Sequence, residues 1–201
     1  MAHISPPLLI ATTNPGKFRE LASVLEDRGI LVVSLSDVGI GEDVPETGTT
    51  LEENAVLKAT AYARMSGMPT LADDSGLEVD ALGGEPGPMS SRYAGEGADD
   101  SDRIAFLLGK LNNIPEDLWT ARFRCVIAVK RPGATEKLYT GVCSGHIVKD
   151  TRGSNGFGYD PVFLLPELGR TMAELSQEEK NRLSHRGRAA RKAAEALRQR
   201  N

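Results

Sequence analysis

The chain has 201 residues, a net charge of -4, 40% hydrophobic and 26% charged side chains, and two cysteines. This composition is typical of a soluble globular protein with one domain, or one core with two lobes. The acidic balance argues against a general nucleic-acid binder, because such proteins normally present a basic surface.

The sequence shows neither a membrane span nor a secretory signal. No apolar run approaches the roughly 20 residues that cross a bilayer, and residues 1–7 lack the basic and apolar stretches of a leader. Two cysteines are too few for a disulfide framework or a structural zinc site. We therefore expect Cys125 and Cys143 to be buried reduced thiols and the protein to be cytoplasmic.

The first apolar run, Leu8–Ala11, predicts a strand, and the polar stretch Thr12–Lys17 follows it directly. Apolar residues at helical spacing then predict a helix to about Gly29. A tight loop between strand and helix points backbone N–H groups at an anion, and Lys17 adds a mobile charge suited to phosphate. The Walker and GxGxxG patterns are both missing. On these residues alone, a plain strand-to-helix turn is an equally good interpretation.

Ile30–Leu35 predicts a second strand, and Ser36–Gly48 predicts an irregular acidic loop. A capping box then opens a helix over Thr50–Ser66. Asn54 and Lys58 are four residues apart in this helix, so they are neighbours on one face. A lysine at such a position usually faces water, and Lys58 alone is a weak functional candidate.

Asp73 and Asp74 stand side by side in Leu71–Gly76, after a short strand expected at Thr70–Ala72. Adjacent carboxylates repel, so a fold that crowds them holds a cation or shifts one pKa for acid–base chemistry. The letters Asp-Asp-Ser-Gly are also ordinary turn chemistry. On this stretch alone a polar turn is the more frequent outcome.

The second half of the chain is expected to alternate between loops, helices and strands. Gly83–Tyr93 predicts an irregular loop, and a helix should follow the acidic Asp99–Asp102. Thr120–Lys130 and Lys137–Val148 alternate apolar and polar residues, which predicts an antiparallel hairpin. Three glycines around two aromatic residues in Gly153–Asp160 would let a ligand approach backbone and rings closely. A Gly-rich hairpin loop explains that segment equally well.

The last predicted helix carries Arg186 four residues before the buried stripe that begins at Ala190, so Arg186 should face inward and need an acceptor. Together, seven groups of residues resemble one family. They are Thr12–Lys17 with Glu20, Glu46–Gly48, Glu53–Ala55 with Lys58, Ala72–Gly76, Gly156–Pro161, Lys180 and Ser184–Gly187. The family is the inosine/xanthosine triphosphate pyrophosphatases, the Ham1-like enzymes that remove non-standard purine nucleotides. The resemblance runs from about Leu8 to Leu197, with an apparent extra residue in the Asp37–Glu46 loop.

The resemblance implies an α/β fold, with an elongated mixed β-sheet in two lobes flanked by helices and a nucleotide cleft between the lobes. It implies a single domain over residues 1–201, with a short leading tail at 1–7, and a homodimer without nucleic-acid or membrane partners. It also implies hydrolysis of dITP/ITP and XTP/dXTP to the monophosphate and pyrophosphate with Mg²⁺. The choice among these substrates and the rejection of guanine are left open.

The family pattern also assigns roles to residues of this chain. Asp74 is expected to act as general base and, with Glu46, as metal ligand. The substrate-binding residues are expected to be Thr12, Thr13, Asn14, Pro15, Gly16, Lys17, Lys58, Ser75, Phe157, Gly158, Tyr159, Asp160, Lys180, His185 and Arg186. The lysines and the amides of residues 13–16 would neutralise phosphates. The two aromatic side chains would stack on the base, and His185 and Arg186 would donate to its C6 oxygen. Asp73 is expected either to support the site or to meet the metal.

Two other functions fit the same chain. One is a phosphohydrolase acting on a different small phosphate, which release of orthophosphate would reveal. The other is a nucleotide-binding regulator without catalysis, which tight binding without turnover would reveal.

Overall fold

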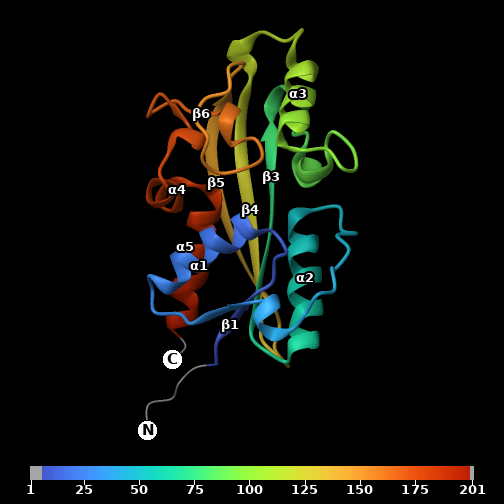
Figure 1. Ribbon diagram of the computed structural model, residues 1–201, viewed down its shortest axis with the longest axis vertical. Helices are drawn as coiled ribbons and strands as arrows, with labels where there is room; N and C mark the ends of the chain where they lie inside the picture. The colour runs from blue at the N-terminus through green and yellow to red at the C-terminus, as the bar shows by residue number, and fades with distance from the viewer. Residues whose placement is uncertain (1–5, 200–201) are drawn as a thin grey trace. The chain divides into compact units, whose positions relative to one another are not determined.

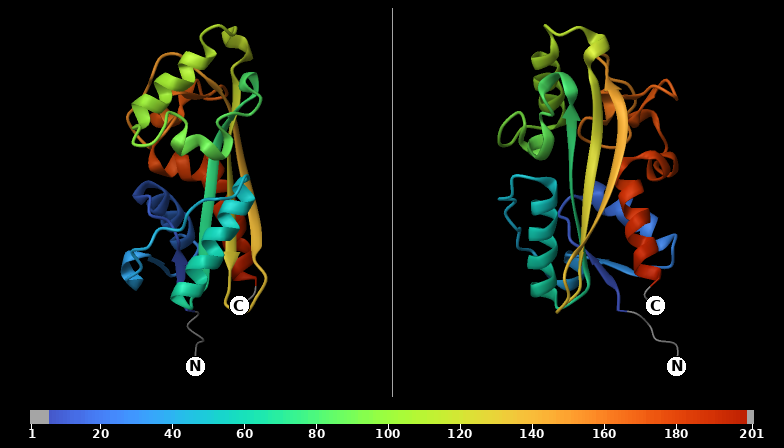
Figure 2. Two further views of the ribbon diagram at one scale, coloured as in Figure 1. Left: turned by 90° about the vertical axis from the view of Figure 1, so that its right-hand side faces the viewer. Right: turned by 180° about the vertical axis from the view of Figure 1, so that it is seen from behind.

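The computed structural model describes residues 6–199 (Figures 1 and 2). Seven strands form one sheet in the order β2-β1-β3-β4-β5-β6-β7. The strands are β1 (Leu8–Ile10), β2 (Val32–Ser34), β3 (Thr70–Val79), β4 (Thr120–Lys130), β5 (Lys137–Ile147), β6 (Phe163–Leu165) and β7 (Arg170–Thr171). The α-helices are α1 (Pro15–Glu26), α2 (Leu51–Ser66), α3 (Asp100–Leu111), α4 (Gln177–Leu183) and α5 (His185–Arg198). Most of the tail expected at residues 1–7 lies outside the described residues.

The sheet is mixed, which confirms the predicted fold class. β1 pairs in parallel with both β2 and β3, whereas β6 pairs antiparallel with β5 and β7. Among residues 6–199, no helix combines the length and apolar character needed to cross a membrane.

The described chain forms two compact units. Unit 1 comprises residues 6–74, 125–141 and 186–199, and unit 2 comprises residues 75–124 and 142–185. The strands β3, β4 and β5 each contribute residues to both units. The single domain over residues 1–201 and the nucleotide cleft between two lobes both stay predictions.

In unit 1, helices cover both faces of the sheet, because successive strand side chains point to opposite faces. One face packs against α1 and α5 through Leu8, Ile10, Leu71, Cys125, Ile127 and Val129. The other packs against α2 through Leu9, Ala11, Ala72, Val126 and Ala128. Figure 1 shows α1 and α5 on one side of these strands and α2 on the other. The Thr50 capping box of α2 is formed as predicted.

Unit 2 has one hydrophobic core. It joins strand residues such as Leu77 and Phe123 to α3 and to the buried rings of Trp119, Tyr159 and Phe163. α3 begins within the acidic run and not after it: Asp99 is the N-cap and forms a capping box with Asp102 in the first turn. The segment predicted as an irregular loop contains a 3-10 helix over Gly87–Arg92.

The strand expected at Thr70–Ala72 is longer than predicted, and the polar turn considered for Asp73 and Asp74 is wrong. β3 runs without interruption from Thr70 to Val79, so both carboxylates lie inside a strand and not in a turn. Gly76 allows this continuation, because a Cβ there would lie 2.2 Å from the carbonyl oxygen of Gly87. Close approach of the 3-10 helix to the strand thus requires glycine at this position.

Candidate active site

Asp73 and Asp74 point to opposite faces of β3. Asp73 shares the face of Leu71, which packs against α1 and α5, whereas Asp74 shares the face of Ala72, which packs against α2. Both carboxylates are nearly inaccessible, with exposed fractions of 1% and 4%. Adjacency in sequence therefore does not crowd the two groups at one point, and each must be considered with its own partners.

The Asp73 carboxylate is surrounded by cations. Its Oδ2 lies 3.4 Å from Lys17 Nζ and accepts a hydrogen bond from Arg186 Nε at 3.2 Å. Arg186 is itself buried and donates from Nη1 to Glu20 Oε2 at 2.5 Å. Burial alone would raise the pKa of Asp73, but Lys17, Arg186 and Lys58 together hold it well below its usual range. Asp73 is therefore ionised at neutral pH.

The Asp74 carboxylate has weaker compensation. Its Oδ2 accepts a hydrogen bond from Asn54 Nδ2 at 3.1 Å, and its Oδ1 lies 3.9 Å from Lys58 Nζ. Burial raises the pKa of Asp74 and Glu46 raises it further, against the opposing effects of Lys58, Lys17 and Asn54. A carboxylate with a raised pKa is a stronger proton acceptor, which is the property of a general base.

Lys58 joins Asp74 to the acidic loop before α2. Its Nζ donates to Glu46 Oε1 at 2.5 Å. Burial would lower the pKa of Lys58, but Asp73, Asp74 and Glu46 reverse that effect and raise it. Asp37, another acid of this loop, instead accepts hydrogen bonds from Ser34.

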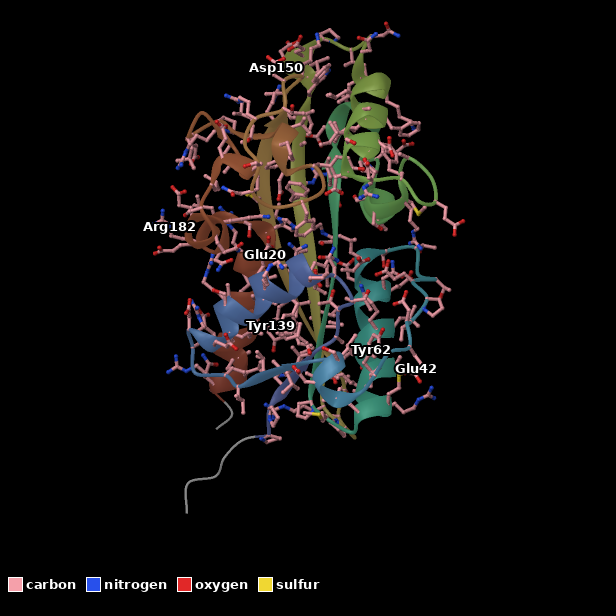
Figure 3. The ribbon with its side chains drawn as sticks, in the orientation of Figure 1. Glu20, Glu42, Tyr62, Tyr139, Asp150 and Arg182 are labelled. Atoms are coloured by element: carbon pink, nitrogen blue, oxygen red, sulfur yellow. The ribbon has the colours of Figure 1, made fainter. Side chains whose placement is uncertain are left out.

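Two hydrogen bonds with the Tyr62 hydroxyl and one to Asn54 shape the loop that carries Glu46. Tyr62 Oη donates to the Glu42 carbonyl at 3.0 Å and accepts from Val44 N at 3.2 Å. Figure 3 labels Tyr62 on α2 and Glu42 on the loop. Gly48 N donates to Asn54 Oδ1 at 2.8 Å, which leaves the Asn54 amide nitrogen to face Asp74.

The Thr12–Lys17 loop is less open to an anion than the sequence suggests. Asn14 Oδ1 accepts hydrogen bonds from the backbone N–H groups of Gly16 and Lys17, as the N-cap of α1. Asn14 N donates to Thr12 Oγ1, and Pro15 has no N–H. Of the three backbone N–H groups in residues 13–16, that of Thr13 is left for phosphate, so this loop would bind an anion mainly through that group and the Lys17 ammonium.

Unit 2 brings together several of the residues predicted to contact the base. Lys180 Nζ donates to Asp160 Oδ2 at 2.6 Å and lies 4.9 Å from the centre of the Phe157 ring. Asp160 Oδ2 also accepts from Phe157 N at 3.0 Å. Gly156 permits this arrangement, because its φ is +83° and a Cβ there would lie 2.1 Å from Asp160 Oδ2. The loop is therefore shaped around a buried ion pair.

Other predicted base contacts lie in the interior of their units. Tyr159 belongs to the unit 2 core and donates from Oη to the Ser90 carbonyl at 2.9 Å. His185 is buried and stacks on Phe123, with ring centres 4.7 Å apart. Arg186 faces inward as predicted, but two of its nitrogens donate to carboxylates of unit 1. Gly158 N donates to Asp100 Oδ2 at 2.7 Å, and Ser75 is half-buried on β3.

The predicted metal ligands suit a hard divalent cation. Mg²⁺ is usually held by one or two carboxylates together with water and substrate phosphates. Glu46 and Asp74 supply two carboxylates beside the Lys58 ammonium, and Glu46 raises the pKa of Asp74. Residues 6–199 contain no group of three or more His, Cys, Asp or Glu side chains placed to hold a metal. The donor set therefore fits Mg²⁺ with substrate completing the coordination.

Sequence reasoning assigned no role to Glu20, Asn54 or Cys125. Glu20 is three residues after Lys17 and four before the buried Val24, a spacing that places all three on one side of α1. Asn54 and Lys58 likewise share one side of α2. Cys125 Sγ lies 4.0 Å from Asp73 Oδ2, and burial raises the pKa of its thiol well above the usual range. No local pattern could have located that contact.

The mixed sheet and the paired carboxylates and lysines define an α/β protein with an acid–base site suited to a phosphorylated ligand. The chain belongs to the Ham1 family, which it matches over residues 8–196. It is 53% identical over 188 residues to the dITP/XTP pyrophosphatase of Geobacillus kaustophilus, covering 94% of this chain and 92% of that protein. Identity to the Bacillus subtilis dITP/XTP pyrophosphatase is 48%, over 94% of this chain and 96% of that protein.

Solved structures agree with this assignment. The Staphylococcus aureus Ham1 protein superposes with a TM-score of 0.86 at 42% identity, covering 98% of this chain and all of that one. The dITP/XTP pyrophosphatase from Mycobacterium abscessus gives a TM-score of 0.71 at 42% identity, covering 96% of this chain and 97% of that one.

Proposed function

We propose that this chain hydrolyses dITP/ITP and XTP/dXTP to the nucleoside monophosphate and pyrophosphate, and so removes non-standard purine nucleotides. The observation that carries the proposal is the buried Asp74, whose raised pKa and neighbouring Lys58 and Glu46 suit water activation beside a polyphosphate. The relatives named above as dITP/XTP pyrophosphatases support the choice of substrate.

In this proposal the residues of unit 1 act on the phosphates. Asp74 accepts a proton from water, whose oxygen forms a bond to the α-phosphorus while the bond to the α–β bridging oxygen breaks. The released pyrophosphate carries away the negative charge of the bridging oxygen. Lys17 and Lys58 offset phosphate charge, and Asn54 fixes the Asp74 carboxylate.

A bound Mg²⁺ would supply charge neutralisation and a polarised water at Glu46 and Asp74. Glu46 and Asp74 would hold the ion, and removal of the metal with EDTA is expected to abolish turnover. A homodimer is a further part of the proposal and rests on the family resemblance. A cytoplasmic location is another part and rests on the expectation of reduced cysteines.

Unit 2 is assigned to the base. Phe157 offers an aromatic face, and the Asp160–Lys180 ion pair offers polar groups near it. Inosine and xanthine present an acceptor oxygen at C6 where adenine presents a donor. A donor such as the Lys180 ammonium therefore favours the first two, because an amino group would leave it unpaired.

The test is a turnover screen over standard and non-standard nucleoside triphosphates, with identification of both products. Release of monophosphate and pyrophosphate from ITP, dITP or XTP is the expected result. Orthophosphate as the primary product would indicate a different phosphohydrolase, and tight binding without turnover would indicate a regulator.

A further inference from the structure

We propose that Lys58 is the resident counter-ion of the Glu46–Asp74 carboxylate pair, and that it must leave this pair for the nucleotide phosphates when the divalent cation binds. The inference rests on the proposed function, because it takes these two carboxylates as the metal ligands. It concerns how the same site changes between its metal-free and loaded states.

The geometry places one ammonium against both carboxylates. Lys58 Nζ lies 2.5 Å from Glu46 Oε1 and 3.9 Å from Asp74 Oδ1, and its side chain is 12% exposed. A divalent cation at the same oxygens would lie within a few ångströms of that ammonium. Two cations at such a separation repel strongly in a partly buried site. The Lys58 ammonium and the metal therefore cannot both occupy the space beside the Glu46–Asp74 carboxylate pair.

The surrounding contacts allow Lys58 to move while Asp74 stays fixed. Asn54 lies one helical turn before Lys58 on α2 and holds the other oxygen of Asp74. Gly48 N in turn fixes the Asn54 amide. Lysine carries its charge on a flexible four-carbon stem, which can redirect the ammonium without moving the helix.

The consequence is coupling between metal and nucleotide. Metal alone must displace Lys58 without giving the ammonium a new partner, so it should bind weakly. Nucleotide phosphates provide that partner, and each ligand should therefore strengthen binding of the other by the same factor. Lys17 offers a contrast, because its ion pair is with Asp73 on the opposite face of β3, although its charge also lowers the pKa of Asp74.

The experiment is calorimetric titration of the nucleotide-free protein with Mn²⁺ alone. Lys58→Met is expected to tighten Mn²⁺ binding by at least about tenfold, because the competing charge is gone. Lys58→Arg keeps a competing cation, and Lys17→Met removes one charge from the same unit. Both should stay within about threefold of the wild type, since neither removes the competing cation from the carboxylate pair. Circular dichroism checks that each variant is folded.

Mn²⁺ binding in Lys58→Met that is no tighter than in the wild type would overturn the inference. Tightening in Lys17→Met equal to that in Lys58→Met would also overturn it, because it would indicate a general charge effect. Asp74→Asn separates this failure from failure of the underlying metal assignment. If wild type and Asp74→Asn bind Mn²⁺ equally, the metal ligands of the proposed function are wrong and the inference falls with them. If only the Lys58 comparison fails, those ligands stand.

Discussion

Asp73 and Asp74 are consecutive in the chain, yet their carboxylates meet opposite surroundings in unit 1. On the Asp73 side, two carboxylates face two cations, namely Lys17 and Arg186. On the Asp74 side, two carboxylates share Lys58, and Lys17 also opposes the rise in the pKa of Asp74. The pKa of Asp73 is lowered and that of Asp74 is raised.

Because the pKa values of Asp73 and Asp74 shift in opposite directions, one strand carries both a structural carboxylate and a reactive one. A fully compensated carboxylate is a poor base and a good anchor, so Asp73 suits the task of holding Lys17 and Arg186 in place. A carboxylate whose pKa is raised by burial and by a neighbouring carboxylate holds protons more strongly. Asp74 therefore has the property that water activation requires.

The largest expected effect is that of Asp74→Asn on catalysis. The substitution keeps the shape but loses the charge and the proton acceptor, so turnover of ITP should fall at least about 10³-fold. Steady-state kinetics with circular dichroism as the folding control checks this. Asp73→Asn is the matched variant and should lose less turnover but more stability. Near-wild-type turnover in Asp74→Asn would contradict the comparison.

Arg186→Met tests the Asp73 side through stability. It leaves Glu20 and Asp73 buried without their shared partner, which typically costs about 3–5 kcal/mol of unfolding free energy. Urea denaturation measures the loss. The double variant with Glu20→Gln should lose less than the sum of the single losses, because the two residues share one interaction. An unfolding free energy within about 1 kcal/mol of wild type would show that Arg186 is not an anchor.

Selectivity for the base should depend on residues of unit 2 and not on residues of unit 1. The wild-type kcat/KM for ITP or XTP should exceed that for ATP by at least about 100-fold, since hydrogen-bonding sites discriminate more strongly than apolar ones. Lys180→Met should narrow this gap. Arg186→Met should lower both values by a similar factor, because the structure engages Arg186 with carboxylates. Selective loss of ITP hydrolysis in Arg186→Met would support the predicted role of Arg186 as a hydrogen-bond donor to the base. A wild-type kcat/KM for ATP within tenfold of that for ITP would contradict the assignment of base selectivity to unit 2.

The smallest effect is expected in the pH dependence of stability. A carboxyl group with a lowered folded-state pKa stabilises the protein above its unfolded-state pKa of about 3.9, and this contribution is lost as the pH falls through the folded-state value. The difference in unfolding free energy between wild type and Asp73→Asn, measured in EDTA from pH 6 to 3, should therefore shrink in acid. A difference that grows in acid would mean that the pKa of Asp73 is not lowered.

Local patterns predicted much of the fold. The Thr50–Glu53 capping box located the start of α2, and strict alternation located β4 and β5, because both signals depend on neighbouring residues. The continuity of β3 could not be predicted in the same way. Two charges inside a buried strand are tolerable only because Lys17, Lys58 and Arg186 neutralise them, and these residues come from distant parts of the sequence.

The sequence predicted which residues belong to the candidate site better than it predicted which residues they contact. Spacing from Ala190 placed Arg186 on the inner face of α5, but its acceptors on α1 and β3 depend on tertiary packing. Asn followed by Pro is a favoured start of a helix, and Asn14 is the N-cap of α1 in the structure. That role competes with the predicted phosphate cradle, because the cap occupies the Gly16 amide of the cradle and the adjacent Lys17 amide.

Because both carboxylates lie within β3, the chemistry depends on the number of residues that precede them in the strand. β3 is aligned with β1 so that Leu9 faces Thr70 and Ile10 faces Leu71. A slip of one residue, or one inserted residue before Asp73, would exchange the two side chains between faces. Asp74 would then face Arg186, and Asp73 would face Glu46. An insertion of two would restore the faces but move both groups along the strand, so this segment should tolerate substitutions far better than changes of length.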